Sequence, residues 1–439
     1  MLTRAMRLGA AVLLVAAAGA CDFEVINPGP TDDKFLDRPE AHQAIANGVA
    51  YYLYDALNEL AYTTSAVTRE LFPAGSTSSF GISQRQQTGL LEYDEEHTGS
   101  PWVSAQRSRY IGESGFARMA ETNPAGTNNY RPAVEAALYA AYALRLLGEN
   151  HCEVAFDGGP ILPRDSALAR AEKWFTTAIE SAGSTASLAT QKTAAYAGRA
   201  SVRVFRGDWS GAVADAALVP TSFTFYAKYD ASQQGFNNRT YFAGANQPYR
   251  AVTTWNTKYE DYYTQTKDPR VPWVDTGMTG DAAVLMVGNV RVPFYQQLKY
   301  AVREAAIMLS SGREMRLIEA EKLLTDGNYT AAMAILNARR AELSPAPPAL
   351  NPANLTEAWT MFKAERGIEL WIEGRRLGDL WRWQKNNTPG ALHELETAGS
   401  ATSYLVANQT LAYPIYKAER QANTNIEEVP TSPICPPNK

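Results

Sequence analysis

One pattern occurs twice in the sequence, in segments 193–217 and 313–338, which lie 120 residues apart. In each, a helical stretch runs into a glycine, a capping residue and an aromatic residue. The matching pairs are Ala200 and Ala320, Gly207 and Gly327, Asp208 and Asn328, Trp209 and Tyr329, and Ala212 and Ala332. Glycine ends helices because it tolerates the left-handed conformation, and Asp or Asn begins them by accepting a backbone N–H hydrogen bond. Each segment is therefore predicted to form an antiparallel helical hairpin.

Helical signals also run through 131–182 and 355–384. Together with the two hairpins near 193–218 and 313–341, these helical segments predict two blocks of helical repeats. The blocks span about 131–218 and 313–384. A single hairpin cannot bury its apolar face, so such units stack. The order of glycine, aromatic and alanine resembles the tetratricopeptide unit. We therefore expect a mostly α fold, a tetratricopeptide-like scaffold of about four hairpins.

The region between the two matching segments has a different composition. Residues 223–263 hold 12 aromatics in 41 positions, about 29%, where the whole chain has 10%. Asn, Gln, Thr and Gly surround them, and no helical stripe fits. We expect an irregular, loop-rich insertion at about 220–300, on the face of the scaffold where a ligand binds.

The first 20 residues have the features of a secretory signal. Arg4 and Arg7 precede a short apolar run, which is too short to span a bilayer. The small residues Ala18, Gly19 and Ala20 then end on Cys21, which resembles the cleavage box of a bacterial lipoprotein. This predicts a signal peptide at 1–20 and lipid attachment, including palmitate, at Cys21, because two or more acyl chains anchor a protein stably. The alternative is an ordinary signal peptide with a chance cysteine.

The charge of the chain and its few cysteines bear on which partners it can bind and on which compartment it occupies. The chain has 41 basic and 46 acidic side chains and no Lys/Arg tract, so nucleic acid is not an expected partner. No apolar run of 18 residues follows Cys21, so contact with the membrane is expected through the lipid alone. The two other cysteines, Cys152 and Cys435, form one disulfide in an oxidising compartment or remain separate thiols. The sequence leaves both open.

Three carboxylates are spaced four residues apart near the C-terminus, at Glu365, Glu369 and Glu373. On one helix they would share a face, which raises the possibility of a carboxylate metal site. Such sites normally add a His three residues after a Glu, and none is present. We instead predict a salt-bridged helix that uses Arg366, Arg375 and Arg376, with close helix contact at Gly374 and with Trp371, Trp381 and Trp383 buried.

This stretch also resembles a known family. RGIELWIEGRRLGDLWRW is similar to the C-terminal signature of SusD/RagB proteins, which are surface lipoproteins of Gram-negative bacteria. The matches in order are Arg366, Glu369, Leu370, Glu373, Gly374, Arg375, Arg376, Asp379, Leu380, Arg382 and Trp383. YPIYKAERQANTN at 413–425 is similar to the family's closing segment, although Tyr416 replaces its second proline. The resemblance spans 21–439 as a single domain.

The resemblance implies a function and a location. Members of this family lie over a SusC-like TonB-dependent transporter at the outer membrane, capture a nutrient and pass it inward. The implied protein is lipid-anchored, faces outward, has no cofactor and binds an oligosaccharide. A peptide ligand is the alternative within the same uptake system, and the sequence does not identify the ligand.

Two other classes of function are weighed against this one. His42, His97, His151 and His393 form no metal motif, and neither a nucleophile elbow nor a phosphate loop is present. Adjacent acids at 94–96 could suggest a glycosidase, but neighbouring side chains point in different directions. We therefore expect no enzyme and no metal site. The second alternative is a helical-repeat scaffold that binds a protein and no nutrient.

Sugars bind to flat aromatic surfaces flanked by hydrogen-bonding groups. Two segments outside the repeats supply both, and we expect them to meet in one shallow groove. The first is 72–102, with Phe80, Gln84, Arg85, Tyr93 and Trp102. The second is the insertion, with Tyr226, Tyr229, Phe236, Asn237, Asn238, Arg239, Tyr241 and Trp255.

Overall fold

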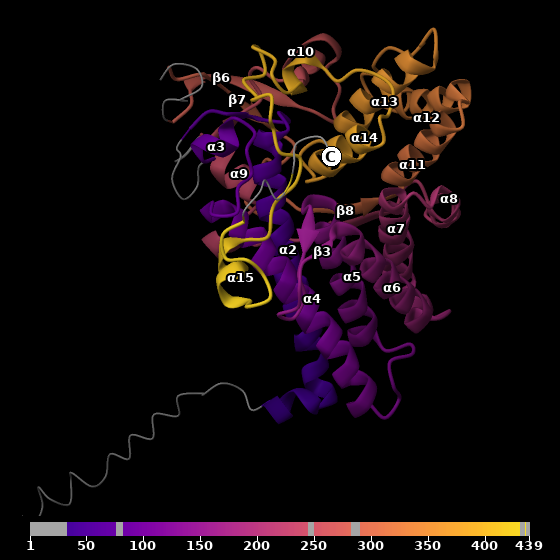
Figure 1. The fold of residues 1–439 in the computed structure, drawn as a ribbon. Helices are drawn as coiled ribbons and strands as arrows, with labels where there is room; N and C mark the ends of the chain where they lie inside the picture. Colours follow the sequence, from indigo (N-terminus) through magenta and orange to yellow (C-terminus); the bar gives the residue numbers. More distant parts are fainter. Residues whose placement is uncertain (1–32, 76–81, 245–249, 282–289, 431–434, 436–439) are drawn as a thin grey trace, which may run out of the picture.

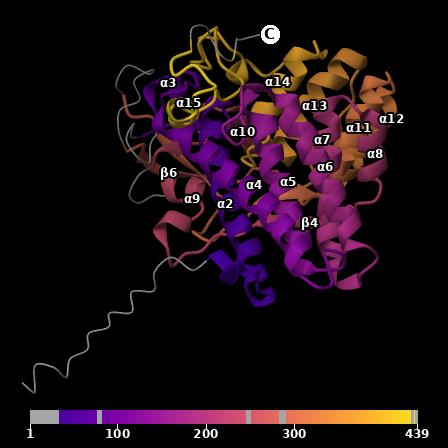
Figure 2. The same ribbon diagram turned by 60° about the horizontal axis from the view of Figure 1, so that its bottom comes forward.

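Long helices carry most of the chain in the computed structural model, which describes residues 33–75, 82–244, 250–281, 290–430 and 435, without the side chains of 96–98. Cys21, the signal segment and Phe80 lie outside the described residues. Figure 1 shows the fold, and Figure 2 shows several helices side by side. The scaffold helices are α2 (Pro39–Val67), α4 (Glu96–Thr122), α5 (Arg131–Asn150), α6 (Arg164–Ala182), α7 (Ala189–Arg206), α8 (Trp209–Ala216), α11 (Gly312–Thr325), α12 (Tyr329–Ala341), α13 (Leu355–Glu369) and α14 (Arg376–Lys385).

The predicted mostly α fold is confirmed, and the hairpins form where the sequence places them. The two matching segments are α7–α8 and α11–α12. Gly207 and Gly327 both have a positive φ, of 78° and 80°. Asp208 accepts a hydrogen bond from the Gly211 N–H at 2.9 Å, and Asn328 accepts one from the Ala331 N–H at 3.2 Å. The local cap chemistry therefore defines both turns.

The two matching hairpins also pack on each other, because α11 lies against α7 and α8. α5 and α6 form a further predicted hairpin, and α2 and α4 add one more pair of packed helices before it. α13 and α14, the last predicted pair, meet through side chains, with the ring centroids of Phe362 and Trp383 6.3 Å apart. Alanines allow close approach in the centre of this array, where Ala137, Ala140 and Ala141 of α5 are fully buried. The largest core cluster joins α2, α5, α6 and α7.

The insertion leaves the scaffold after α8 and returns before α11. Its two ends pair with each other, since β4 (Thr224–Ala227) and β8 (Ile307–Ser311) are antiparallel. Among the described residues the other sheets are also two-stranded and antiparallel: β1 (Phe72–Pro73) with β5 (Val252–Thr253), β2 (Glu153–Val154) with β3 (Leu162–Pro163), and β6 (Trp273–Thr279) with β7 (Pro293–Gln297).

Short helices complete this irregular side. They are α3 (Gln84–Gln87), α9 (Arg239–Gly244) and α10 (Lys258–Thr266), with α15 (Lys417–Ala422) near the C-terminus and 3₁₀ turns at Asp33–Asp37, Ala186–Leu188, Gln234–Phe236 and Glu394–Glu396. In both views α3, α9 and β6 lie on the side of α2 that faces away from α11 and α12. The irregular elements therefore gather at one side of the helical array.

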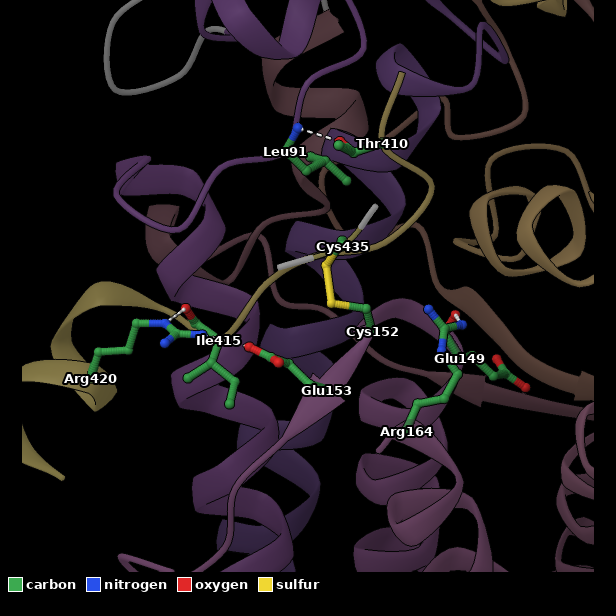
Figure 3. Close-up of a disulfide and its surroundings, with 9 residues drawn as sticks. All are labelled: Leu91, Glu149, Cys152, Glu153, Arg164, Thr410, Ile415, Arg420 and Cys435. Carbon is green, nitrogen blue, oxygen red and sulfur yellow. Dashed lines mark hydrogen bonds and ion pairs between the residues drawn. A yellow bond between two sulfur atoms is a disulfide. The ribbon is translucent and has the colours of Figure 1, made fainter. Parts of the chain in front are cut away.

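The C-terminal segment crosses back over the scaffold and is fastened to it (Figure 3). The N–H of Tyr413 donates to Asn150 O at 2.7 Å, and the N–H of Cys152 donates to Tyr413 O at 3.0 Å. Arg420 forms an ion pair with Glu153. A disulfide joins Cys152 to Cys435, with Cα atoms 5.7 Å apart.

The helix expected to carry three carboxylates ends earlier than predicted. α13 stops at Glu369, and Glu373 lies in the turn that leads to α14. Ile372 and Gly374 in this turn have positive φ values of 55° and 69°. Gly374 lies against the backbone of Ala61 in α2, so the predicted close contact at this glycine is made with another hairpin. Glu373 therefore does not share a helix face with Glu365 and Glu369.

No helix in the described part of the chain has both the length and the apolar character that a membrane span needs.

Candidate functional site

The two segments predicted to bind ligand do touch each other. β1 of the first pairs with β5 of the second, and the ring of Phe72 meets that of Trp255 edge-on, with centroids 5.2 Å apart. Phe72 is buried and Trp255 is half-buried. The contact therefore joins one core side chain, Phe72, to one that keeps part of its surface, Trp255.

Trp102 is not a ligand contact, and this expectation was wrong. Its side chain is 1% exposed and its ring meets His151 edge-on, with centroids 5.1 Å apart. The residue lies in α4, which begins at Glu96 and packs on α2 and α5. The aromatic ring fills the space between helices, so it has no surface to offer a ligand.

Three further predicted contacts are wrong for a related reason: Tyr229, Asn237 and Asn238 are buried. The Tyr229 hydroxyl donates to Tyr54 O at 3.0 Å. Asn238 donates to Ala305 O at 2.8 Å and accepts from the Tyr241 N–H at 2.9 Å. Asn237 donates to Asp230 O and Gln233 O. These amides hold the insertion's own loops together.

The remaining predicted contacts have accessible side chains. Gln84 and Arg85 are exposed on α3, Tyr226 is exposed, and Tyr93, Phe236, Arg239, Tyr241 and Trp255 are half-buried. Arg85 forms ion pairs with Glu92 and Asp94, which places these acids in a surface charge cluster. Arg239 forms an ion pair with Glu59 at 2.9 Å. The ring of Phe236 stacks on Tyr51 of α2 with centroids 4.8 Å apart.

A second aromatic group, which the residue-level prediction missed, lies on the β6–β7 hairpin. The rings of Trp273 and Tyr295 stack with centroids 4.7 Å apart and planes 14° apart. Tyr263 of α10 meets Trp273 at 6.0 Å. All three side chains are half-buried, so each keeps part of its ring on the surface. We call Tyr263, Trp273 and Tyr295 the aromatic platform.

Charged groups border the platform. Asp275 is exposed and faces Tyr295 across the hairpin, and Lys267 lies 4.9 Å from the Tyr263 ring centroid. Trp273 Nε1 donates to Glu260 O at 3.3 Å, which fixes the indole. Burial, together with the nearby Glu260 and Asp275, raises the pKa of Tyr295 above its usual value. The Tyr295 hydroxyl therefore stays protonated and can donate a hydrogen bond.

Comparison with known proteins rests on structure alone, since no protein-family model and no curated protein matches the sequence. A SusD superfamily protein from Parabacteroides distasonis superposes with a TM-score of 0.66 at 13% identity, covering 90% of this chain and 99% of that one. A SusD-like carbohydrate-binding protein from Bacteroides vulgatus gives 0.63 at 14% identity, covering 90% and 98%. A SusD/RagB family protein from Bacteroides thetaiotaomicron gives 0.62 at 13% identity, covering 90% and 98%. The chain has the SusD fold.

The C-terminal stretch that resembles the SusD/RagB signature forms a buried charge network. Glu369 contacts Arg270 at 2.7 Å and Arg339 at 3.0 Å, and Glu365 also contacts Arg270 at 2.7 Å. Burial alone raises the pKa of Glu369, but the two arginines outweigh it and hold that pKa below its usual value. Within the described residues no three His, Cys, Asp or Glu side chains are placed to hold a metal ion.

The arginines of this SusD-like stretch reach beyond their own helices. Arg366 contacts Asp379 of α14 at 2.7 Å, Arg375 contacts Glu314 of α11 at 2.6 Å, and Arg376 contacts Glu396 at 2.9 Å. The predicted salt-bridged helix is thus a network between hairpins. Trp371 and Trp383 are buried as predicted, whereas Trp381 is only half-buried and lies 3.5 Å from the Arg164 guanidinium carbon.

Proposed function

We propose that this protein is a surface lipoprotein that captures an oligosaccharide and delivers it to a SusC-like TonB-dependent transporter of the outer membrane. The SusD fold supports the general class of nutrient-binding protein. One structure with this fold is described as carbohydrate-binding, which is a property of that protein. Lipid attachment at Cys21 would keep the protein at the membrane, facing outward, next to its transporter.

The aromatic platform is the observation that carries the choice of ligand. The stacked rings cover one face of each other and remain half-exposed elsewhere, and the C–H face of a sugar ring can pack against the aromatic surface that remains. Asp275, Lys267 and the Tyr295 hydroxyl stand beside the rings as hydrogen-bonding groups for sugar hydroxyls. A binding site needs this combination of flat surface and polar rim.

The platform also has a suitable position. β6, β7 and α10 belong to the insertion, outside the helical repeats whose side chains are committed to packing. Loops carried on a rigid scaffold can change with the ligand without unfolding the scaffold. The exposed or half-buried residues Gln84, Arg85, Tyr241 and Trp255 remain proposed secondary contacts.

The test is a glycan array, followed by calorimetry with the mature lipoprotein in detergent. Trp273→Ala is expected to lower affinity for the bound glycan at least tenfold, and Trp273→Phe, which keeps a flat ring, to retain most of it. Trp381→Ala, which removes a half-buried tryptophan from α14, is the matched control and should bind normally.

Three results would contradict the proposed site, the proposed ligand or the proposed partner. Unchanged glycan binding by Trp273→Ala would show that the site lies elsewhere. Binding of peptides and of no glycan would show that the ligand is a peptide. Affinity purification of the tagged lipoprotein from its own membranes tests the partner. Absence of any TonB-dependent transporter from that material would favour the scaffold without nutrient uptake.

A further inference from the structure

A pocket of about 370 Å³ opens between α10, α13, α14 and the segment 391–396. This volume is within the lower range of small-molecule sites, roughly 300–1,000 Å³. Its charged lining comprises Lys258, Lys363, Arg376, Glu396 and Glu394, and His393 also lines it. We call it the basic pocket. It contains none of the residues of the aromatic platform.

The cations of the basic pocket are buried. Lys258, Lys363 and Arg376 are 7%, 5% and 2% exposed, and Glu396 is 2% exposed. Glu396 accepts from Lys258 Nζ at 2.8 Å and from Arg376 Nε and Nη2 at 2.9 Å each. The other carboxylate of the lining, Glu394, is exposed. Glu396 is therefore the one buried carboxylate of the pocket lining, and it bonds two of the three buried cations, Lys258 and Arg376.

The two ammonium groups have more hydrogens than acceptors. Among the described residues, Lys258 Nζ donates only to Glu396, and Lys363 Nζ donates to the carbonyls of Thr388 at 3.1 Å and Gly390 at 2.7 Å. An ammonium carries three donor hydrogens. Three of the six hydrogens thus have no N or O acceptor among the described residues, although buried charged groups are normally fully hydrogen-bonded. Lys258 Nζ also lies 5.0 Å from the Tyr259 ring centroid, and Lys363 Nζ lies 5.7 Å from that of Trp383.

Burial and a neighbouring arginine lower the pKa of both lysines. Burial, and then the neighbouring Arg376, lowers the pKa of Lys258 to about 8 and that of Lys363 to about 8. Opposing charges limit the effect, since Glu396 and Glu70 face Lys258, and Glu321 faces Lys363. Both lysines remain largely charged near pH 7, so the pocket keeps a positive excess.

A further polar group lies next to Lys258. Gly367 of α13 has no side chain, and a Cβ there would lie 3.0 Å from Lys258 Nζ, 3.0 Å from the Tyr259 hydroxyl and 3.1 Å from Arg376 Nη1. The Tyr259 hydroxyl is fully buried and has no hydrogen-bond partner among the described residues. Donors therefore crowd this part of α13, and acceptors are scarce.

We propose that the basic pocket binds a small carboxylate, held by Lys258, Lys363 and Arg376 beside Glu396. A carboxylate has two oxygens and about four acceptor positions and carries no donor, which matches a site rich in donors. A water molecule fits less well, because its own two hydrogens need acceptors. The bound carboxylate belongs either to a simple carboxylic acid or to a sugar acid.

Isothermal titration of the mature lipoprotein with acetate, glucuronate and glucose at constant ionic strength tests the site. Both carboxylates should bind in a saturable manner and glucose should not bind here. Equal affinity for acetate and glucuronate assigns a simple carboxylate, and glucuronate binding at least tenfold tighter assigns a sugar acid. Either result supports the site.

Two lysine variants locate the binding. Lys258→Met and Lys363→Met should each weaken carboxylate affinity at least tenfold, while Lys385→Met, which removes an exposed lysine of α14, should leave it unchanged. Melting curves without ligand show whether each variant is folded. Absence of carboxylate binding by the unmutated protein overturns the proposal, as does full affinity in a folded Lys258→Met. The aromatic platform takes no part in this test, so the result is separate from that of the glycan array.

Discussion

The helical repeats and the β6–β7 hairpin of the insertion place their charged and aromatic side chains differently. In the repeats, charges are buried and shared between hairpins, as when Arg382 of α14 contacts Glu321 of α11 at 2.7 Å. In the insertion, strands of two to seven residues carry half-exposed rings such as Trp273 and Tyr295. Each repeat residue is constrained by several neighbours. The surface residues of the insertion have fewer constraints and are available for ligands.

This difference has a physical cause. A charge buried between helices cannot lose its partner without leaving an uncompensated ion, so the network resists substitution. A ring at the surface of a two-stranded hairpin contributes only part of its area to packing. We therefore expect substitutions in the repeats to change stability and substitutions on the platform to change binding.

The largest effect is expected from Arg382→Ala. Its guanidinium donates to both oxygens of Glu321, at 2.7 and 2.9 Å, and to Asp379 at 3.2 Å, and all three side chains are buried. Truncation leaves a buried carboxylate without its main partner, so the free energy of unfolding should fall by about 3–5 kcal/mol in urea denaturation.

Lys322→Ala is the control on the same helix pair. Lys322 lies next to Glu321 in the chain, but its ion pair with Asp326 is at the surface. Its loss should cost about 0.5 kcal/mol or less. Equal losses for the two variants would show that the buried network is no more important to stability than a surface pair.

The disulfide connects the C-terminal segment to the scaffold, and removing it should have a smaller effect than Arg382→Ala. Cys152 follows α5, and Cys435 lies 283 residues later, beyond the segment that crosses α5. A crosslink over a long loop restricts the unfolded chain, so Cys152→Ser with Cys435→Ser should lower the free energy of unfolding by about 2–4 kcal/mol. A reductant should have the same effect on the unmutated protein and none on the variant. Two free thiols in the denatured, unreduced protein would contradict the pairing.

The structure of the helical repeats could be predicted from the sequence more fully than that of the insertion. The hairpins were predictable because Gly207 with Asp208, and Gly327 with Asn328, are local signals that specify a turn wherever they occur. The packing of α8 on α11 was not predictable, because nothing within either hairpin specifies its neighbour. The end of α13 was missed because the non-glycine residue Ile372 adopts a positive φ, which a run of apolar and charged residues does not signal.

The site was harder to predict for a different reason. Asn237 and Asn238 have the same chemistry whether they bind a sugar or a backbone carbonyl, so composition cannot separate the two roles. Trp273 and Tyr295 are 22 positions apart, and only the register of a hairpin brings them together. Trp273 and Asp275 are two positions apart, the spacing that puts two side chains on the same face of a strand. A pattern of only two residues is too short to predict the strand. Trp102 was misassigned because α4 begins within a stretch that has no helical periodicity.

A smaller, pH-dependent effect is expected at Glu70 in the core. Burial raises the pKa of its carboxyl to about 7, even though the Ile372 N–H donates to it at 2.7 Å. In the unfolded chain the pKa is near its ordinary value, so between about pH 4.5 and 7 the folded state holds a proton that the unfolded state releases. Stability from this group is therefore lost as pH rises through that window.

Glu70→Gln keeps an acceptor for the Ile372 N–H and cannot ionise. It should raise the free energy of unfolding at pH 8 by about 2 kcal/mol and leave it nearly unchanged at pH 5. The same change in stability for Glu70→Gln at both pH values would show that its carboxyl titrates normally.

The smallest effect on stability is expected from the residue that matters most for the proposed ligand. Trp273 and Trp371 form a matched pair, since each indole stacks on a tyrosine and donates to a backbone carbonyl. The Trp371 ring is buried, lies 5.4 Å from Tyr259 and donates to Glu70 O at 2.9 Å, whereas Trp273 is half-exposed and its hydrogen bond is 3.3 Å long. Trp371→Ala should therefore cost about 3–5 kcal/mol through the cavity that it leaves.

Trp273→Ala loses little more than its stack on Tyr295, and an aromatic pair contributes about 0.5–1.5 kcal/mol beyond the area that it buries. Its unfolding midpoint in urea should therefore remain close to that of the unmutated protein, while glycan affinity falls. If Trp273→Ala instead lost as much stability as Trp371→Ala, the platform would belong to the core. Both regions would then serve packing. The ligand site would have to lie among the exposed residues Gln84 and Arg85 of α3 and the half-buried residues Arg239 and Tyr241 of α9.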